Sequence, residues 1–515
     1  MKKSIVLILV SLFATVAANA VTRHVPSEYS TIQSALNASQ TSDTVLVDDG
    51  VYTGTINWPQ VNRIVLTSVN GNEASFLDGN FAGPVVNMNG NVAKLTATIK
   101  GFTIQNGLTR ANPANGFVAG GSGISLFNMT LNLNFCNLTT NRITGDAANF
   151  SYCNGSAISA ESSKLLITDC SFTQNSIDST YTIFGGVIYT GNSQLSLTRS
   201  NFDSNTILST GNIQGGVVAA TFGQILIKNV SVTQNEINIS GNGSIVGGAY
   251  YFQGDGTSQL TNALIANNTL ISTNTIQGGG IWSSLFLSVI HCTIAGNHYQ
   301  SGSGVGGNSI SLTSYLSSTP KLKVINSILW NPEGSTFEMA FVGAPSVTYS
   351  DVLNGFSGSG NTASDPLFVS GKDFHLQNTS PCVDRSALAA NPPTDLDGNA
   401  RPMPVGTKAD LGCYEVNQSL RMENASNEVN PITAVQIYPN PVHQTANLSF
   451  LLKEESKVTV TVLDFSGRMM KEVMNETLAS GAHNVVLNSD KLTTGDYFVQ
   501  MQIGDKIFSQ KITVD

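Results

Sequence analysis

Short runs in which polar and apolar residues alternate recur through most of the chain. Leu195-Ser196-Leu197-Thr198 and Ile225-Leu226-Ile227-Lys228 are two of them. Side chains that alternate in this way point to opposite faces of a strand, so each run predicts a short β-strand with one face turned inward. Similar segments follow one another at intervals of about 29–35 residues, which lies within the range of solenoid repeats.

Stacking the copies of the repeat produces four columns of like residues. The first is small, the second is large and apolar, the third is asparagine, and the fourth is apolar again. The columns are Cys136, Cys170, Ser200, Val230, Ala263, Cys292 and Ser327; Leu138, Phe172, Phe202, Val232, Ile265, Ile294 and Leu329; Asn141, Asn175, Asn205, Asn235, Asn268 and Asn297; and Ile143, Ile177, Ile207, Ile237, Leu270 and Tyr299. Short strands cannot bury an apolar face alone, so coils stacked about 4.8 Å apart would close a continuous core.

Two residue types are expected to shape the turns of each coil. Asparagine tolerates a left-handed φ, and stacked amides can hydrogen-bond from coil to coil. Glycine pairs such as Gly185-Gly186 and Gly215-Gly216 recur between the asparagines, where a tight corner would feed the next strand. The sequence therefore predicts an all-β chain with a right-handed parallel β-helix, since parallel connections are overwhelmingly right-handed. A β-propeller is the rival, but its blades need about 40–45 residues.

Composition and charge limit the partners and the location. Charged residues make up 11% of the chain, the formal net charge is -9, and the pI is near 5.2, which disfavours nucleic acid or an anionic membrane as main partner. Lys2 and Lys3 precede an apolar run and Ala18-Asn19-Ala20, which predicts a secretory signal peptide over residues 1–20. No later segment is long and apolar enough to span a bilayer, so no transmembrane segment is expected after cleavage.

The recurring Phe-x-x-Asn and Gly-Gly-x-Ile patterns resemble right-handed β-helix surface proteins, including polymorphic outer-membrane adhesins. Upstream, the segment Tyr29 to Leu36, followed by Asp43-Thr44-Val45-Leu46-Val47, looks like the N-terminal cap of pectin-lyase-like β-helices. This resemblance implies a capping helix near Thr31 to Ala38 that shields the first coil from edge-to-edge pairing. Residues 21–100 would then hold the cap and first coils, and residues 101–350 the repeats.

From Tyr349 the repeat gives way to another pattern. Asp365-Pro366-Leu367-Phe368, Asp395-Leu396-Asp397-Gly398 and Asp410-Leu411-Gly412-Cys413 mark residues 351–415. Their order resembles the choice-of-anchor module of Q type, which implies a closing module ahead of an anchoring or sorting signal. Cys382 and Cys413 stand where that module has small residues, and they are the predicted disulfide pair of an exported chain.

Carboxylates are densest in this module. Asp395, Asp397 and Asp410, with Asp384 and Glu415 nearby, suggest a Ca²⁺ site, because that ion prefers hard oxygen ligands. The spacing is not that of an EF-hand loop, and Arg401 could neutralise part of the set. Turn caps and salt links are the alternative, which we favour.

The last part of the chain changes pattern once more. Residues 416–433 lack periodicity and predict a linker. Beyond them, residues 434–515 carry alternating runs at Val458 to Val462, His483 to Leu487 and Tyr497 to Met501, which predict a small immunoglobulin-like antiparallel sandwich. With Gly495-Asp496-Tyr497-Phe498 and the ending Gln510 to Val514, this part resembles the C-terminal sorting domain of type IX secretion substrates. The resemblance implies a Bacteroidetes-type diderm, handling by the type IX machinery, passage across the outer membrane, and release or attachment at the cell surface.

Catalysis is the harder question. The outward column before the small residues contains Asp169, Arg199 and His291, so Asp169 and Arg199 would lie one coil apart. A lyase or hydrolase acting on acidic polysaccharide would use Arg199 or His291 as base with Asp169 as partner. The alternative is an exposed salt bridge of under ~1 kcal/mol and a solvated histidine.

Three functions stay open on the sequence. They are an adhesin-like protein that binds glycans or proteins, a polysaccharide lyase or hydrolase, and a passive surface-layer or spacer protein. Trp282, Trp330, Tyr250 and Tyr251 are candidate sugar platforms, with packing as their ordinary role. Of the other cysteines, Cys136, Cys170 and Cys292 fall at one repeat position, which favours a buried small-residue column, and the state of Cys153 is left open.

Overall fold

The computed structural model describes residues 20–90, 94–110, 119–145, 152–254, 256–314, 321–335, 337–387, 392–403, 406–416, 432–438, 440–464, 468–490, 492–503 and 506–514. Most of the signal peptide predicted over residues 1–20, and most of the linker predicted over residues 416–433, lie outside these ranges. The chain divides into two units at Asn417 and Gln418. Among the described residues, no helix is long and apolar enough to cross a membrane.

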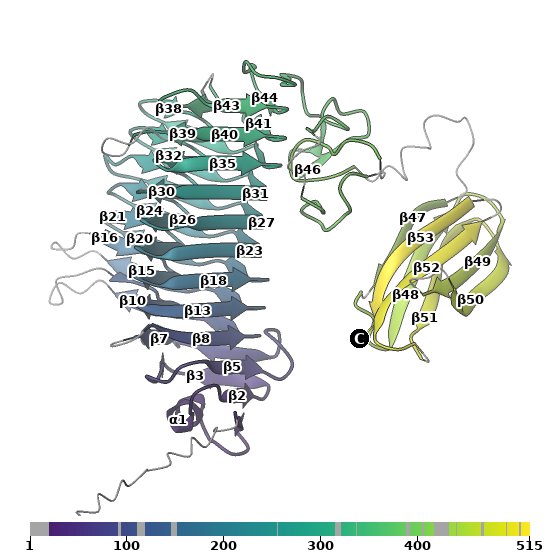
Figure 1. Ribbon diagram of the computed structural model, residues 1–515, viewed down its shortest axis with the longest axis horizontal. Helices are drawn as coiled ribbons and strands as arrows, with labels where there is room; N and C mark the ends of the chain where they lie inside the picture. Colours follow the sequence, from purple (N-terminus) through teal and green to yellow (C-terminus); the bar gives the residue numbers. More distant parts are fainter. Residues whose placement is uncertain are drawn as a thin grey trace, which may run out of the picture. The chain divides into compact units, whose positions relative to one another are not determined.

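The first unit is a β-solenoid whose strands pair in parallel with the same strand of the next coil (Figure 1). We call its four sheets A to D. Sheet A comprises β1 (Thr22–Val25), β2 (Thr44–Val47), β3 (Gly50–Thr53), β5 (Ile64–Ser68), β6 (Ser75–Asp78), β8 (Leu95–Lys100), β9 (Thr103–Gln105), β13 (Met129–Asn134), β14 (Asn137–Thr139), β18 (Lys164–Thr168), β19 (Ser171–Thr173), β23 (Gln194–Asp203), β27 (Ile225–Thr233), β31 (Thr257–Ala266), β35 (Phe286–Ile290), β36 (Thr293–Ala295), β40 (Leu322–Ile325), β41 (Ile328–Trp330), β43 (Ser346–Thr348) and β44 (Asp351–Val352).

The other three sheets each take one strand from each coil they cross. Sheet B comprises β4 (Ile56–Asn57), β7 (Val86–Asn89), β12 (Ile124–Phe127), β17 (Ile158–Glu161), β22 (Ile188–Gly191), β26 (Val218–Thr221), β30 (Tyr250–Gln253), β34 (Ile281–Ser283), β39 (Ile310–Leu312) and β42 (Met339–Ala340). Sheet C comprises β10 (Leu108–Arg110), β15 (Arg142–Gly145), β20 (Ser176–Ser179), β24 (Thr206–Ser209), β28 (Glu236–Ile239), β32 (Thr269–Ser272) and β37 (His298–Ser301). Sheet D comprises β11 (Ala119–Gly120), β16 (Tyr152–Asn154), β21 (Thr182–Phe184), β25 (Ile213–Gln214), β29 (Ile245–Val246), β33 (Ile276–Gln277) and β38 (Val305–Gly306).

The predicted columns are in register. Phe172 pairs with Phe202, Phe202 with Val232, and Val232 with Ile265, as the alignment of the copies required. The rings of Phe172 and Phe202 stack with centroids 4.5 Å apart. The small column is buried as predicted, with Cys136, Cys170 and Cys292 all inside the main core.

The asparagine column forms a hydrogen-bonded ladder through the interior. Asn175 Nδ2 donates to Asn205 Oδ1 at 3.1 Å, and Asn205 Nδ2 donates to Asn235 Oδ1 at 2.8 Å. The prediction that the asparagines themselves take the left-handed φ is wrong. The residue before each asparagine does so, for example Gln174 at 55° and Ser204 at 54°. That bend turns the asparagine side chain inward, where the next coil supplies its partner.

The ladder separates two hydrophobic cores. Sheets A and B enclose the main core, whereas sheets C and D pack face to face around a smaller one that includes Ile177, Ile207 and Cys153. We call the layer formed by sheets C and D the fin. The predicted glycine corners lie where sheet D leads back into sheet B. Gly185 has φ 61°, and a Cβ there would lie 2.1 Å from the Ile188 carbonyl oxygen, so no other residue fits.

The expected capping helix is present as α1 (Ile32–Ala38). Thr31 is its N-cap and exchanges hydrogen bonds with Ser34 in a capping box. Ile32, Ala35 and Leu36 are buried against the first coils, so the helix covers the open end of the core.

The closing module, residues 351–415, lies against the flank of the last coils (Figure 1). Its regular strands are β45 (Phe368–Ser370) and β46 (Asp373–Leu376). The outward position occupied by Ser231 in β27 is Leu264 in the next coil, and Leu264 packs against Phe374 of the module. Ile328 likewise packs against Leu376. The change from polar to apolar outward residues therefore marks where the module docks.

The second unit consists of two antiparallel sheets around one core. The alternating runs predicted there are strands. The sheets comprise β47 (Ile432–Tyr438), β48 (Thr445–Leu452) and β51 (Gly481–Asn488), and β49 (Ser456–Leu463), β50 (Met469–Leu478), β52 (Gly495–Ile503) and β53 (Lys506–Val514).

Candidate functional site

The outward column that held the catalytic candidates occupies a left-handed bend in every coil. Asp169 has φ 54°, Arg199 45° and His291 49°. Asp169 and Arg199 form the predicted ion pair between neighbouring coils, with Arg199 Nε 2.7 Å from Asp169 Oδ1 and Nη2 2.8 Å from Oδ2. Hydrogen bonding to Asp169 raises the pKa of Arg199. An arginine held in its charged form does not accept a proton, so the pair does not support the role of Arg199 as base.

His291 does not join this pair, and the expectation that it is solvated is wrong. Its side chain is fully buried where the closing module covers the solenoid. Arg401 Nη1 contacts His291 Nδ1, and the amide of Asn326 lies 2.9 Å from Nε2. The apolar outward residues of the last coils bring the module over this column, and the module's arginine then reaches the ring. A histidine enclosed in this way cannot meet a polymer substrate.

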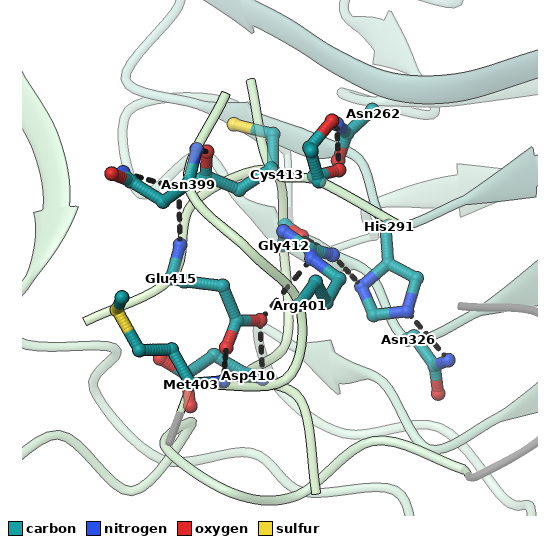
Figure 2. A network of polar contacts seen from close by, with 12 residues as sticks. Asn262, His291, Asn326, Asn399, Arg401, Met403, Asp410, Gly412, Cys413 and Glu415 are labelled. Carbon is teal, nitrogen blue, oxygen red and sulfur yellow. Dashed lines mark hydrogen bonds and ion pairs between the residues drawn. The ribbon is translucent and has the colours of Figure 1, made fainter. Parts of the chain in front are cut away.

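Figure 2 shows the buried polar network around Arg401. The Arg401 Nε atom lies 3.1 Å from Glu415 Oε1, and both side chains are fully buried. Glu415 Oε1 also accepts a hydrogen bond from the backbone N–H of Asp410. Burial raises the pKa of Glu415 to about 7 and that of Asp410 to about 6, and it lowers the pKa of Arg401. These enclosed groups hold the module on the solenoid rather than face a ligand.

The three Ca²⁺ candidates each have a separate structural partner. Asp395 accepts hydrogen bonds from Asn399 and from the backbone N–H of Glu415. Asp410 accepts from the backbone of Asp384 and Val416, and Asp397 lies 2.7 Å from His375 Nε2. Across the described ranges, no three His, Cys, Asp or Glu side chains converge in an arrangement that could hold a metal ion. The partners that the structure gives these carboxylates are those of turn caps and salt links.

The structure does not join Cys382 to Cys413. Both are free thiols that lie in different clusters. Cys382 Sγ is 3.3 Å from Asp351 Oδ2, whereas Cys413 packs beside Leu264 and Phe374. Nearness in the sequence did not place the two side chains on one face of the module. Cys153 lies in the core of the fin, with its sulfur 3.3 Å from Ser179 Oγ.

A different group of residues forms the best candidate site. The outer faces of sheets D and B meet at the glycine corner, and five aromatic side chains form a chain of ring contacts there. We call this group the aromatic bend; it comprises Tyr152, Phe184, Tyr189, Tyr251 and Trp282. The coil between those of Tyr189 and Tyr251 contributes Ala219 at the paired position. Tyr251 and Trp282 occupy paired positions on neighbouring coils and stack with centroids 4.5 Å apart. Phe184 of sheet D contacts the ring of Tyr152 and the rings of Tyr189 and Tyr251 edge to face.

The aromatic bend is more accessible at its earlier coils than at its later ones. Tyr251 and Trp282 are only 4% and 8% exposed, because each covers a face of the other. Tyr152 is 36% exposed, and Phe184 and Tyr189 are partly exposed. The rings that a ligand could cover are therefore Tyr152, Phe184 and Tyr189.

One carboxylate accompanies these rings. Glu161 ends β17, and it interacts electrostatically with the phenol of Tyr189 on the next coil. Burial raises the pKa of Glu161 and also that of Tyr189. A phenol whose pKa is raised stays protonated, so Tyr189 is suited to hydrogen bonding rather than to proton abstraction.

Sequence reasoning found part of this site. It named Trp282 and Tyr251, which lie in the bend, together with Tyr250, which is buried in the main core, and Trp330, which packs under the closing module. It missed Tyr152, Phe184, Tyr189 and Glu161. A pattern around the glycine pairs could have found Phe184 and Tyr189. Phe184 is the residue just before a glycine pair, where the side chain faces outward from sheet D. Tyr189 lies three residues after the same pair, where the side chain faces outward from sheet B.

The outer face of the fin carries a second, polar hollow. It has a volume of about 450 Å³ and is lined mainly by hydroxyl and amide side chains of sheet C. Arg142 and Asp178 also line it, 3.9 Å apart and both well exposed. It has no aromatic ring among its lining residues, so it offers hydrogen bonds without a stacking surface.

Comparison with known proteins identifies the second unit. The family model described as the secretion system C-terminal sorting domain matches residues 436–515. No curated protein and no solved structure matches the chain. The chain is therefore an all-β solenoid protein that carries a type IX sorting domain, and it is exported across the outer membrane by that system.

Proposed function

We propose that this protein binds a saccharide at the aromatic bend, without cleaving it, after export to the cell exterior. The observation that carries the proposal is the contact of rings from sheets D and B beside a carboxylate on rigid strands. Aromatic rings pack on the apolar faces of sugars, and nearby polar groups fix the orientation of the hydroxyls. Side chains held on strands of a solenoid need little ordering when a ligand binds.

The chemistry at the bend favours binding over cleavage. A glycosidase needs two carboxylates about 5–10 Å apart, and a lyase needs a base near a cation. Of the described residues that contact the aromatic bend, Glu161 is the one carboxylate, and the phenol beside it has a raised pKa. Its neighbours Tyr189 and Thr221 supply hydroxyls and no cation.

The delivery of this site follows from the two ends of the chain. We infer that residues 1–20 direct passage across the inner membrane and that the sorting domain directs the second step. The resemblance of residues 351–415 to a choice-of-anchor module fits a solenoid held at the surface. Release into the medium is the other outcome, and cell fractionation with an antibody against the solenoid separates the two.

The binding proposal is tested by affinity electrophoresis of the exported protein in gels that contain different polysaccharides. Retardation is expected with at least one polymer, and Phe184→Ala should weaken it about threefold to tenfold, as expected for the loss of one stacking contact. Phe135→Ala is the matched control, because Phe135 is 50% exposed on another face, over Lys100.

Three results would overturn the proposal. Release of new reducing ends or of ultraviolet-absorbing unsaturated products would make the protein an enzyme. Retardation that Phe184→Ala and Phe135→Ala change equally would place binding elsewhere. Failure of every polymer to retard the protein would support a passive spacer.

A further inference from the structure

The side chain of Glu161 lies in a space that exists because the neighbouring coil has a glycine at the facing position. In sheet B, Glu161 pairs in register with Gly191, and Gly191 pairs with Thr221. A Cβ built on Gly191 would lie 2.3 Å from Glu161 Oε2. The carboxylate therefore extends over the next coil, in the space that a side chain at position 191 would fill.

This position brings the carboxylate beside the accessible rings. Tyr189 lies in the same strand as Gly191, and its phenol is near enough to Glu161 to interact with it electrostatically. Glu161 itself is only partly buried, so its side chain is accessible to a ligand. A carboxylate has about four acceptor positions, so some stay free for donors from a ligand.

The charge on Glu161 is not neutralised by an ion pair with any described residue. A carboxylate of this kind accepts hydrogen bonds from two adjacent sugar hydroxyls, which are neutral donors. It repels a second carboxylate or a sulfate that approaches it, and the repulsion is strong where burial lowers the local dielectric constant.

We propose that Glu161 determines the specificity of the aromatic bend and restricts its ligands to neutral saccharides. This inference rests on the proposed function, since it concerns the same site. It assigns a role that the rings alone cannot have, because an aromatic face stacks on a hexose and on the corresponding hexuronate alike.

The test uses pairs of polymers that differ in the oxidation of the sugar's C6 carbon, such as mannan against polymannuronate and galactan against polygalacturonate. The exported protein is expected to bind the neutral member of a pair at least tenfold more tightly. Glu161→Gln keeps the shape and removes the charge, so it should weaken neutral binding by about threefold and reduce the preference at least fivefold. Glu236→Gln is the matched control, because Glu236 is an exposed carboxylate of sheet C and its loss changes the net charge equally.

A second measurement needs no variant. If repulsion from Glu161 causes the preference, raising NaCl from about 0.02 M to 0.5 M should reduce it, because the Debye length falls several-fold. The control variant should show the same salt dependence as the original protein.

The outcomes separate this inference from the proposed function. Equal or tighter binding of the uronate polymers, or a preference that Glu161→Gln leaves intact, would overturn the role of Glu161 while binding at the bend stands. Uronate binding that is abolished by Phe184→Ala and left unchanged by Arg142→Ala would also overturn it, because the acidic ligand would then occupy the aromatic bend and not the hollow on the fin. Absence of binding to any polymer would overturn the proposed function itself.

Discussion

Replacing Asn205 by alanine would remove one rung from the middle of the asparagine ladder. The Asn205 side chain is fully buried and takes part in four hydrogen bonds. Its Oδ1 atom accepts from Asn175 N at 2.9 Å and from Asn175 Nδ2 at 3.1 Å, and its Nδ2 atom donates to Phe172 O and to Asn235 Oδ1. The substitution would leave the buried N–H of Asn175 without this acceptor.

The expected cost follows from these contacts. A buried donor left without a partner costs about 1–3 kcal/mol, and each further hydrogen bond contributes about 0.5–1.5 kcal/mol net. Three such bonds and one stranded donor together destabilise the solenoid by about 2.5–7.5 kcal/mol. Asn201→Ala is the control in the same coil, because Asn201 is only partly buried and donates one side-chain hydrogen bond, to Ser171 Oγ at 3.2 Å. Its expected cost is under about 1 kcal/mol.

The assay can observe the first unit alone. The three tryptophans, Trp58, Trp282 and Trp330, all lie before residue 418, so tryptophan fluorescence during denaturant unfolding reports on the solenoid and not on the sorting domain. Hydrogen exchange of the peptide that contains Asn175 adds a local measurement, with exchange at least a hundredfold faster expected in Asn205→Ala. If Asn205→Ala and Asn201→Ala shift the unfolding midpoint equally, the ladder contributes nothing special and the reasoning is refuted.

Three further predictions concern the closing module and the glycine corner. In denaturant unfolding, Arg401→Met should destabilise the solenoid by about 3–5 kcal/mol, because it leaves a buried carboxylate unpaired. An equal effect of Arg385→Met, at an exposed arginine, would contradict this. His375 lies between two carboxylates that raise its pKa to about 9. Its contribution to the free energy of unfolding is therefore complete below about pH 6.5 and is lost as pH rises through about 9. Thermal unfolding of His375→Gln at different pH values should lack this loss of stability. Gly216→Ala should cost more than about 1 kcal/mol, because its Cβ would lie 2.3 Å from a carbonyl oxygen of the next coil, whereas Gly371→Ala meets open space and should change the melting temperature little.

Much of the solenoid could be predicted because the same pattern of residues recurs in successive coils. The inward residues Phe172, Phe202 and Val232 appeared at one period, and the structure pairs them as predicted. The glycine corners were predicted for the same reason, whereas the capping helix followed from the resemblance of Tyr29 to Leu36 to the cap of pectin-lyase-like β-helices. The asparagine ladder followed from the column, although the left-handed bend lies one residue earlier.

The candidate sites were decided by contacts between segments distant in the sequence. His291 had the pattern of an exposed residue, and it is buried because Arg401, 110 positions later, folds back over it. Cys382 and Cys413 lie in one small region of an exported chain and were predicted to form a disulfide, but their side chains enter different clusters. A pattern within one repeat carries no information about which module will cover that repeat.

The sequence alone determined the repeat, its inward columns and the sorting signal, since each depends on residues read locally or at one fixed period. Only the tertiary structure decided which outward residues stay accessible. Phe184 and Tyr189 belong to different strands of one coil, and they contact each other because the glycine corner folds sheet D against sheet B. Glu161 joins them from the preceding coil, because Gly191 leaves the space above it empty.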